Sequence, residues 1–163
     1  MLQAIRLSLQ RHVQVRTHLF NCTLTMSNLP YSEAWLAGSS STQFYTRTYT
    51  PHESIKAAIV FVHGFAEHVG RYTHFHPLLS ARGIAVFTFD QRGFGLTAQD
   101  TKGNKSKSST YGKTCWKDQM ADIEWAVEYT RKLFDNKPIF LMGHSMVKSL
   151  RLLWFFFWFW RFV

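Results

Sequence analysis

The segment IFLMGHSM, residues 139–146, decides the fold of this 163-residue chain. Its first four residues form an apolar run of strand length, and Gly143, His144 and Ser145 follow directly. The pattern Gly-x-Ser-x-Gly marks a sharp turn from a strand into a helix, which strains the serine backbone and exposes its Oγ above a sheet. The last position departs from this pattern, because Val147 stands where the second glycine is expected. The segment therefore predicts a buried strand that ends in a nucleophilic serine.

Two more apolar runs of strand length precede this segment. Residues 57–62 (AAIVFV) and 84–89 (IAVFTF) are continuous runs, as expected of strands that are covered on both faces of a sheet. Residues 43–49 alternate between polar and apolar side chains and predict a half-exposed strand. Residues 31–42 are mixed and serine-rich and predict a loop, and the polar, lysine-bearing residues 98–114 predict a solvated surface loop.

Two helices are predicted between these strands. One begins between Arg71 and His76, carries Pro77 in its first turn and ends at Gly83. The other spans about residues 115–134, where apolar side chains spaced by three and four predict one buried face. That face comprises Trp116, Met120, Ile123, Val127, Thr130 and Phe134. Apolar strands that alternate with helices predict the α/β class, with a mostly parallel sheet and flanking helices.

Polar residues and glycines follow three of the predicted strands, at residues 63–65, 90–93 and 143–146. Because the carboxyl ends of parallel strands meet at one edge of a sheet, we expect these residues to lie close together. The backbone amides of Phe65 and Met146 are then candidates for an oxyanion hole. We also expect the glycines beside the serine to be required, since a Cβ there would meet neighbouring backbone.

Three motifs together resemble the α/β-hydrolases of the monoglyceride lipase group, also described as serine aminopeptidase S33-like. They are FVHGFAEHVGRY (61–72), FDQRGFG (89–95) and MGHSM (142–146). The resemblance covers about residues 30–146 and implies an incomplete α/β-hydrolase fold, without the C-terminal strands and cap. It implies hydrolysis of carboxylic esters, with monoacylglycerols or related lipid esters as substrates, and requires no metal or organic cofactor.

The same resemblance assigns roles to individual residues. It implies Ser145 as the catalytic nucleophile and the amides of Phe65 and Met146 as the oxyanion hole. It also implies that Glu67 and Arg71 hold the glycerol end of a monoacylglycerol. The spacing of these two residues leaves a second interpretation open, namely a surface ion pair between side chains four positions apart. Ala66, where many relatives have glycine, predicts a slightly different oxyanion loop.

The other polar residues near the strand ends are interpreted as structural. We expect His63 to hold its loop by hydrogen bonds, and Asp90 and Arg92 to brace the turn after their strand. His144 precedes the serine and is not expected to act as its base. The remaining histidines of this region are taken as surface residues without a named partner. They are His68, His74 and His76.

After Ser145 the sequence contains no Asp, Glu or His. In α/β-hydrolases the acid and the histidine follow the serine along the chain, and a serine without a base is a poor nucleophile at neutral pH. We therefore expect a chain truncated after the nucleophile and inactive as it stands. The alternative is a non-catalytic fragment that binds a membrane or a partner through the aromatic residues 147–163. The apolar run 152–160 is too short to span a bilayer, which takes about 20 residues. Residues 147–163 suit a membrane surface, but out-of-frame or intronic sequence read as protein is the interpretation that we favour.

The net charge of +9 is concentrated at the two ends of the chain. Residues 1–29 form a predicted extension that either resembles a mitochondrial transit peptide or precedes a true start at Met26, which we favour. A basic stripe or module for nucleic acid is not evident, so we predict no nucleic-acid partner. We expect a cytoplasmic or membrane- or lipid-droplet-associated protein, with Cys22 and Cys115 as reduced thiols.

Overall fold

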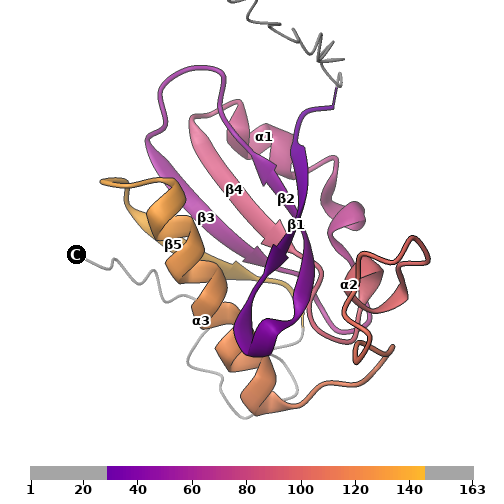
Figure 1. The fold of residues 1–163 in the computed structure, drawn as a ribbon. Helices are drawn as coiled ribbons and strands as arrows, with labels where there is room; N and C mark the ends of the chain where they lie inside the picture. The colour runs from indigo at the N-terminus through magenta and orange to yellow at the C-terminus, as the bar shows by residue number, and fades with distance from the viewer. Residues whose placement is uncertain (1–28, 146–163) are drawn as a thin grey trace, which may run out of the picture.

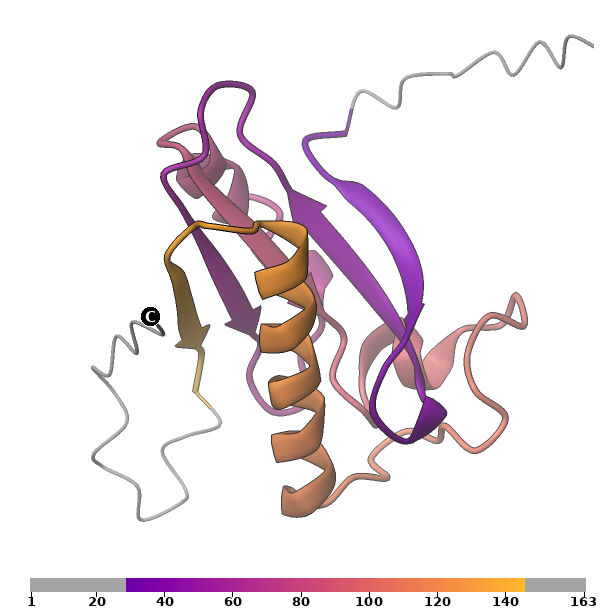
Figure 2. The same ribbon diagram turned by 60° about the vertical axis from the view of Figure 1, so that its left-hand side comes forward.

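The computed structural model describes residues 29–145, which form a five-stranded mixed sheet with helices on both faces (Figures 1 and 2). The strands are β1 (Ser32–Ala37), β2 (Gln43–Tyr49), β3 (Ala57–Val62), β4 (Ile84–Phe89) and β5 (Ile139–Gly143). The helical segments are η1 (Ser39–Ser41), η2 (Val69–Tyr72), α1 (His76–Ser80), α2 (Gly95–Gln99) and α3 (Trp116–Leu133). The predicted N-terminal extension, the aromatic residues 147–163 and Met146 lie outside the described residues.

The strands lie in the order β1-β2-β4-β3-β5. β3, β4 and β5 are parallel, whereas β1 and β2 join the sheet in antiparallel fashion. The predicted α/β class is confirmed, and the three apolar runs are the three parallel strands. β5 pairs with β3 from Ala58–Ile139 to Val62–Gly143 and is an edge strand of the described sheet.

Each face of the sheet has its own hydrophobic core, because successive side chains of a strand point to opposite faces. On one face, Ala58, Val60 and Val62 of β3 pack with buried residues of β4 under α3. On the other face, Phe61 packs with Tyr49 and Val86 and is covered by side chains of η2 and α1. The continuous apolar runs thus reflect strands that are covered on both sides, as predicted.

The predicted buried face of α3 is confirmed in part. Thr130 and Phe134 are buried, and Ile123 and Val127 pack against the core. At the start of the helix the prediction is wrong, because Trp116 is 52% exposed and Met120 is 42% exposed. Asp122 and Ala126 are buried as well, and Asp122 pairs with Arg92, which apolar spacing could not predict.

One further prediction is corrected. Residues 32–37 were expected to be part of a loop but form β1, whose side chains are mostly exposed and whose order comes from pairing with β2. The first predicted helix is confirmed as α1, which starts at His76 with Pro77 in its first turn and is followed by Gly83 (φ +84°); the short η2 precedes it. None of the helices between residues 29 and 145 is long and apolar enough to cross a membrane.

Candidate active site

The loops after β3 and β5 meet because their strands are paired to the last residue. Val62 pairs with Gly143, and the amide of His144 donates a hydrogen bond of 3.0 Å to the carbonyl oxygen of Val62. The residue after His144 is Ser145. The loop that begins at His63 and the predicted nucleophile are therefore held at the same edge of the sheet, as expected from the parallel strands.

Ser145 has the left-handed backbone conformation of a nucleophile elbow. Its φ is +59°, a value that non-glycine residues adopt at a cost of about 1–3 kcal/mol. Its side chain lies at the surface. We expected a Cβ on the glycine before the serine to come too close to neighbouring backbone. This is wrong for the described residues, because a Cβ on Gly143 would lie 3.8 Å from the carbonyl oxygen of Val62, an ordinary van der Waals contact.

The loop after β3 presents the predicted oxyanion donor. The Phe65 amide donates to no acceptor among residues 29–145, so its hydrogen remains available to a ligand. Ala66 follows with φ +56°, which explains why glycine suits this position. The Phe65 side chain is 67% exposed and its ring packs against Phe94 at a centroid distance of 5.2 Å. The second predicted donor, Met146, lies outside the described residues.

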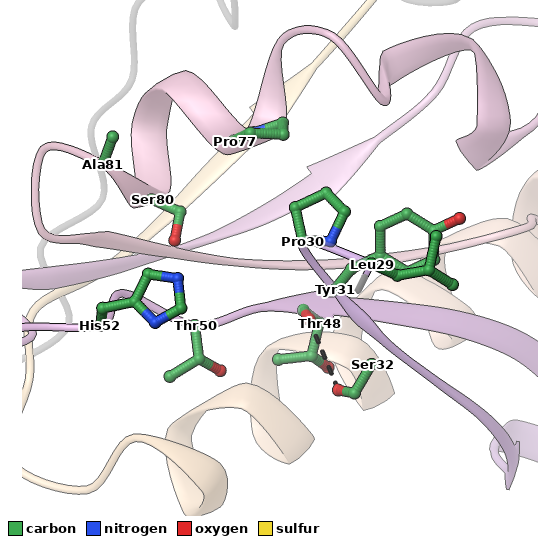
Figure 3. A pocket seen from close by; sticks show the side chains of 10 residues that line it. All are labelled: Leu29, Pro30, Tyr31, Ser32, Thr48, Thr50, His52, Pro77, Ser80 and Ala81. Carbon is green, nitrogen blue, oxygen red and sulfur yellow. Dashed lines mark hydrogen bonds between the residues drawn. The ribbon is translucent and has the colours of Figure 1, made fainter. Parts of the chain in front are cut away.

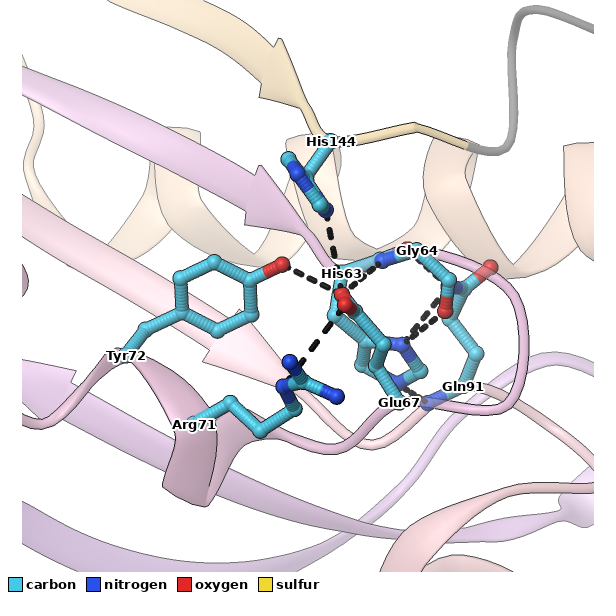
Figure 4. Close-up of polar contacts among 7 residues, drawn as sticks. All are labelled: His63, Gly64, Glu67, Arg71, Tyr72, Gln91 and His144. Carbon is cyan, nitrogen blue, oxygen red and sulfur yellow. Dashed lines mark hydrogen bonds and ion pairs between the residues drawn. The ribbon is translucent and has the colours of Figure 1, made fainter.

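A single carboxylate oxygen holds this loop in place (Figure 4). Oε2 of Glu67 accepts hydrogen bonds from the amide of Gly64 at 2.8 Å and from the hydroxyl of Tyr72 at 2.5 Å. It also accepts one from Nδ1 of His144 at 3.2 Å. Glu67 thus connects the loop after β3 to helix η2 and to the residue before the candidate nucleophile.

The hydrogen bonds to Glu67 stabilise its charged form. Burial alone raises the pKa of this carboxyl, but the bonds from Tyr72, Gly64 and His144 outweigh burial and lower the pKa to about 2. Arg71 adds an ion pair, with Nε 3.6 Å from Oε1. The Glu67 side chain is 12% exposed, whereas that of Arg71 is 60% exposed. The ion pair between Glu67 and Arg71 that their spacing suggested is present, and the Arg71 guanidinium stays exposed to solvent.

His63 is a buried structural residue, in agreement with its interpretation from the sequence. Its Nε2 accepts the amide hydrogen of Gln91 at 2.9 Å, so Nδ1 carries the proton and donates to the carbonyl oxygen of Gly64 at 2.8 Å. Burial lowers the pKa of His63 to about 4. With both ring nitrogens engaged and the ring neutral, His63 is not placed to act as a base for Ser145.

Asp90 and Arg92 brace the turn after β4, as interpreted from the sequence. Asp90 accepts hydrogen bonds of 2.7 Å from the amides of Val69 and Leu96, and so ties η2 and α2 to the end of β4. Arg92 forms a bidentate pair with the buried Asp122 of α3, at 2.7 and 3.0 Å. These bonds fix the elements around the site rather than supply reactive groups.

A hollow of about 400 Å³ lies beside the Glu67 loop. Its lining residues come from β3, the η2–α1 segment and the end of β5. They include Phe61, Glu67, Arg71, Tyr72, Met142 and His144. A second hollow of about 430 Å³ lies at the opposite end of the strands, between β1, β2 and α1 (Figure 3). The first hollow adjoins the predicted site and contains both predicted substrate-binding residues.

His76 was expected at the surface and is instead fully buried. It opens α1 facing the sheet, where its ring packs against Tyr49, Phe61 and Tyr72. Neither ring nitrogen has a hydrogen-bond partner among the described residues, and burial lowers the pKa of His76 to about 4. His76 is therefore a neutral core residue.

Sequence reasoning missed the partners of the predicted site residues. We did not anticipate the hydrogen bonds that Tyr72 and His144 donate to Glu67, or the bond that Gln91 donates to His63. Tyr72, Gln91 and His144 all lie within the quoted motifs. The pair between Asp122 and Arg92 was not anticipated either. Their position within a motif could have identified Tyr72, Gln91 and His144 as site residues, whereas nothing in the local sequence indicated the role of Asp122.

The parallel strands, the strained serine after β5 and the loop after β3 define an α/β-hydrolase. A family model described as serine aminopeptidase S33 matches residues 53–146, and the chain belongs to this family. A putative monoglyceride lipase of Schizosaccharomyces pombe is 38% identical over 109 residues, which cover 66% of this chain and 27% of that protein.

Two solved structures share the fold. One is a thermostable carboxyl esterase from Bacillus coagulans in complex with glycerol, 26% identical with a TM-score of 0.60, covering 71% of this chain and 36% of that one. The other is a soluble variant of monoglyceride lipase from Saccharomyces cerevisiae with a substrate analogue, 25% identical with a TM-score of 0.55, covering 71% and 34%. The chain spans well under half of the length of these relatives.

Proposed function

We propose that this chain carries the nucleophile and both oxyanion-hole donors of a serine hydrolase that acts on carboxylic esters, with monoacylglycerols as the substrate class. The observation that carries the proposal is the left-handed backbone of Ser145 at the end of β5, beside a loop whose Phe65 amide has no acceptor among residues 29–145. Membership of the S33 family and the likeness to an esterase and a monoglyceride lipase support the ester as the reacting group.

In the proposed reaction, Oγ of Ser145 attacks the ester carbonyl carbon and loses its proton to a base. The negative charge that develops on the carbonyl oxygen accepts hydrogen bonds from the amides of Phe65 and Met146. Collapse of this intermediate expels the alcohol and leaves an acyl-Ser145, which water then hydrolyses. The Glu67 bonds keep the Phe65 amide pointed at the oxyanion, since they fix Gly64 and Tyr72 on either side of it.

The hollow beside this loop suits the alcohol end of the substrate. Arg71 lies at its rim with an exposed guanidinium that donates to hydroxyl groups, while Oε2 of Glu67 is already occupied by three donors. We therefore assign direct contact with a glycerol end to Arg71 and to Oε1 of Glu67. The same pair would be of little use to a purely apolar leaving group.

We infer that none of His63, His76 and His144 is the base, because both ring nitrogens of His63 are engaged, His76 is buried, and His144 is bound to Glu67. Without a base we expect very slow acylation, because losing the base of such a triad costs on the order of 10⁶ in turnover.

Chemical rescue tests the proposal. The chain is incubated with p-nitrophenyl butyrate, with and without added imidazole, and acylation is located by mass spectrometry. We expect butyrylation of Ser145 that is accelerated by imidazole and absent from S145A. An equal acylation in S145A, or modification elsewhere with Ser145 untouched, would refute the assignment of the nucleophile. Comparison with an aminoacyl p-nitroanilide separates an ester from an amide preference.

A further inference from the structure

The connection between α2 and α3 is strongly and uniformly basic. Residues 101–117 contain five lysines and no acid. They are Lys102, Lys105, Lys107, Lys113 and Lys117, and all except the half-buried Lys105 are exposed. The acids that flank this basic segment, Asp100 and Asp118, are buried and half-buried respectively. The basic segment thus presents four exposed lysines to solvent and contains no acid of its own.

Exposed aromatic side chains alternate with these lysines. Tyr111 is 55% exposed and Trp116 is 52% exposed. The Tyr111 ring packs edge-on against Phe94 at 6.0 Å, and Phe94 in turn contacts the exposed Phe65 ring. Leu96, two residues after Phe94 in the chain, is 41% exposed. A row of apolar groups therefore runs from the oxyanion loop to the basic segment.

The basic segment is anchored to the site rather than free of it. The amide of Gly112 donates to the carbonyl oxygen of Gly93 at 2.8 Å, and the approach is so close that a Cβ on Gly93 would lie 3.1 Å from the carbonyl oxygen of Lys113. The ammonium of Lys105 closes the loop on the carbonyl oxygen of Ser109 at 2.8 Å. The Gly112 bond ties the basic segment to the turn after β4, and β4 is parallel to β3, so this turn lies at the same edge of the sheet as the loop after β3.

We propose that the basic segment, together with Leu96 and Phe65, is a docking surface for an anionic lipid bilayer. Lysines attract the negative surface of such a bilayer, and tyrosine and tryptophan rings settle at the boundary between head groups and acyl chains. The combination of both on one anchored edge fits this partner better than a protein interface, whose core is depleted of lysine. The surface is distinct from the aromatic residues 147–163 and does not depend on esterase activity.

Flotation with lipid vesicles tests this assignment on the full chain. We compare vesicles of phosphatidylcholine alone with vesicles that contain about 30% phosphatidylserine. The variant K107A/K113A is expected to bind the anionic vesicles more weakly, by about fivefold for each lysine removed. W116A is expected to weaken binding further. The matched control is K132A/K137A, because these lysines lie at or beyond the other end of the 18-residue α3, about 27 Å away, and carry the same charge.

A local probe distinguishes this surface from the rest of the chain. Cys115 is exposed and next to Trp116, so an environment-sensitive dye on Cys115 in a C22S background reports insertion at that point. We expect a blue shift with anionic vesicles. Equal loss of binding in K107A/K113A and K132A/K137A, or an unchanged dye spectrum on bound vesicles, would overturn the proposal. Binding of single-stranded RNA through the same lysines without vesicle binding would overturn it as well.

Discussion

Replacing Glu67 with glutamine removes the charge that holds the oxyanion loop while it keeps the shape of the side chain. The pKa of Glu67 lies at about 2 against 4.5 for an ordinary glutamate. Each pKa unit corresponds to about 1.4 kcal/mol, so the shift is equivalent to about 3 kcal/mol at neutral pH. Solvent at the rim of the hollow screens part of this, and we expect E67Q to lower the free energy of unfolding by about 1–2 kcal/mol.

The pH dependence of this loss provides the sharper assay. A carboxyl whose pKa is lowered by folding stabilises the native state above its unfolded pKa, near 4.5, and this contribution disappears as the pH falls through about 2. The free energies of unfolding of wild type and E67Q, measured with urea, should therefore differ most at pH 7 and become equal towards pH 2. The control E128Q breaks an exposed ion pair and should cost about 0.5 kcal/mol or less. A constant difference between wild type and E67Q across this pH range would refute the reasoning.

Three further substitutions test the packing around the site. D122A leaves the guanidinium of Arg92 without its buried partner and should cost about 3–5 kcal/mol in urea unfolding, because breaking a buried pair strands the remaining charge. H76F replaces a ring without hydrogen-bond partners among the described residues. Burial lowers the pKa of His76 to about 4, so the free energy of unfolding of wild type decreases as the pH falls below about 6.5. H76F should not show this decrease and should be more stable than wild type at pH 5. G95A would place a Cβ 2.1 Å from Oδ2 of Asp90 at φ +51° and should reduce the yield of folded protein, measured by gel filtration.

The parallel part of the fold could be predicted because the information is local. Residues 57–62, 84–89 and 139–142 are continuous apolar runs, and such runs suit strands that are covered on both faces. β1 could not be predicted in this way, because its side chains are mostly exposed and its order comes from hydrogen bonds to β2. Edge strands of this kind are specified by their neighbour rather than by their own composition.

The site shows the same division between local and long-range information. The loop after β3 and the serine after β5 are marked by motifs, and their approach follows from parallel pairing. The bond between His144 and Glu67 joins residues 77 positions apart and has no local signal. His76 was expected at the surface, yet the aromatic rings around it bury its ring completely.

In the proposed mechanism, the described residues prepare the oxyanion hole but do not activate the nucleophile. Glu67, His63 and Asp90 each hold backbone around the Phe65 amide, through the amides of Gly64, Gln91 and Val69 respectively. All three act by hydrogen bonds that are complete in the absence of substrate, so the donor geometry is set before any ester arrives, which is the condition for electrostatic stabilisation of a transition state. Proton removal from Ser145 requires a base, and His63, His76 and His144 are not free to supply it. Stabilisation of the oxyanion and activation of the serine are therefore separable here, and imidazole rescue should restore the second without altering the first.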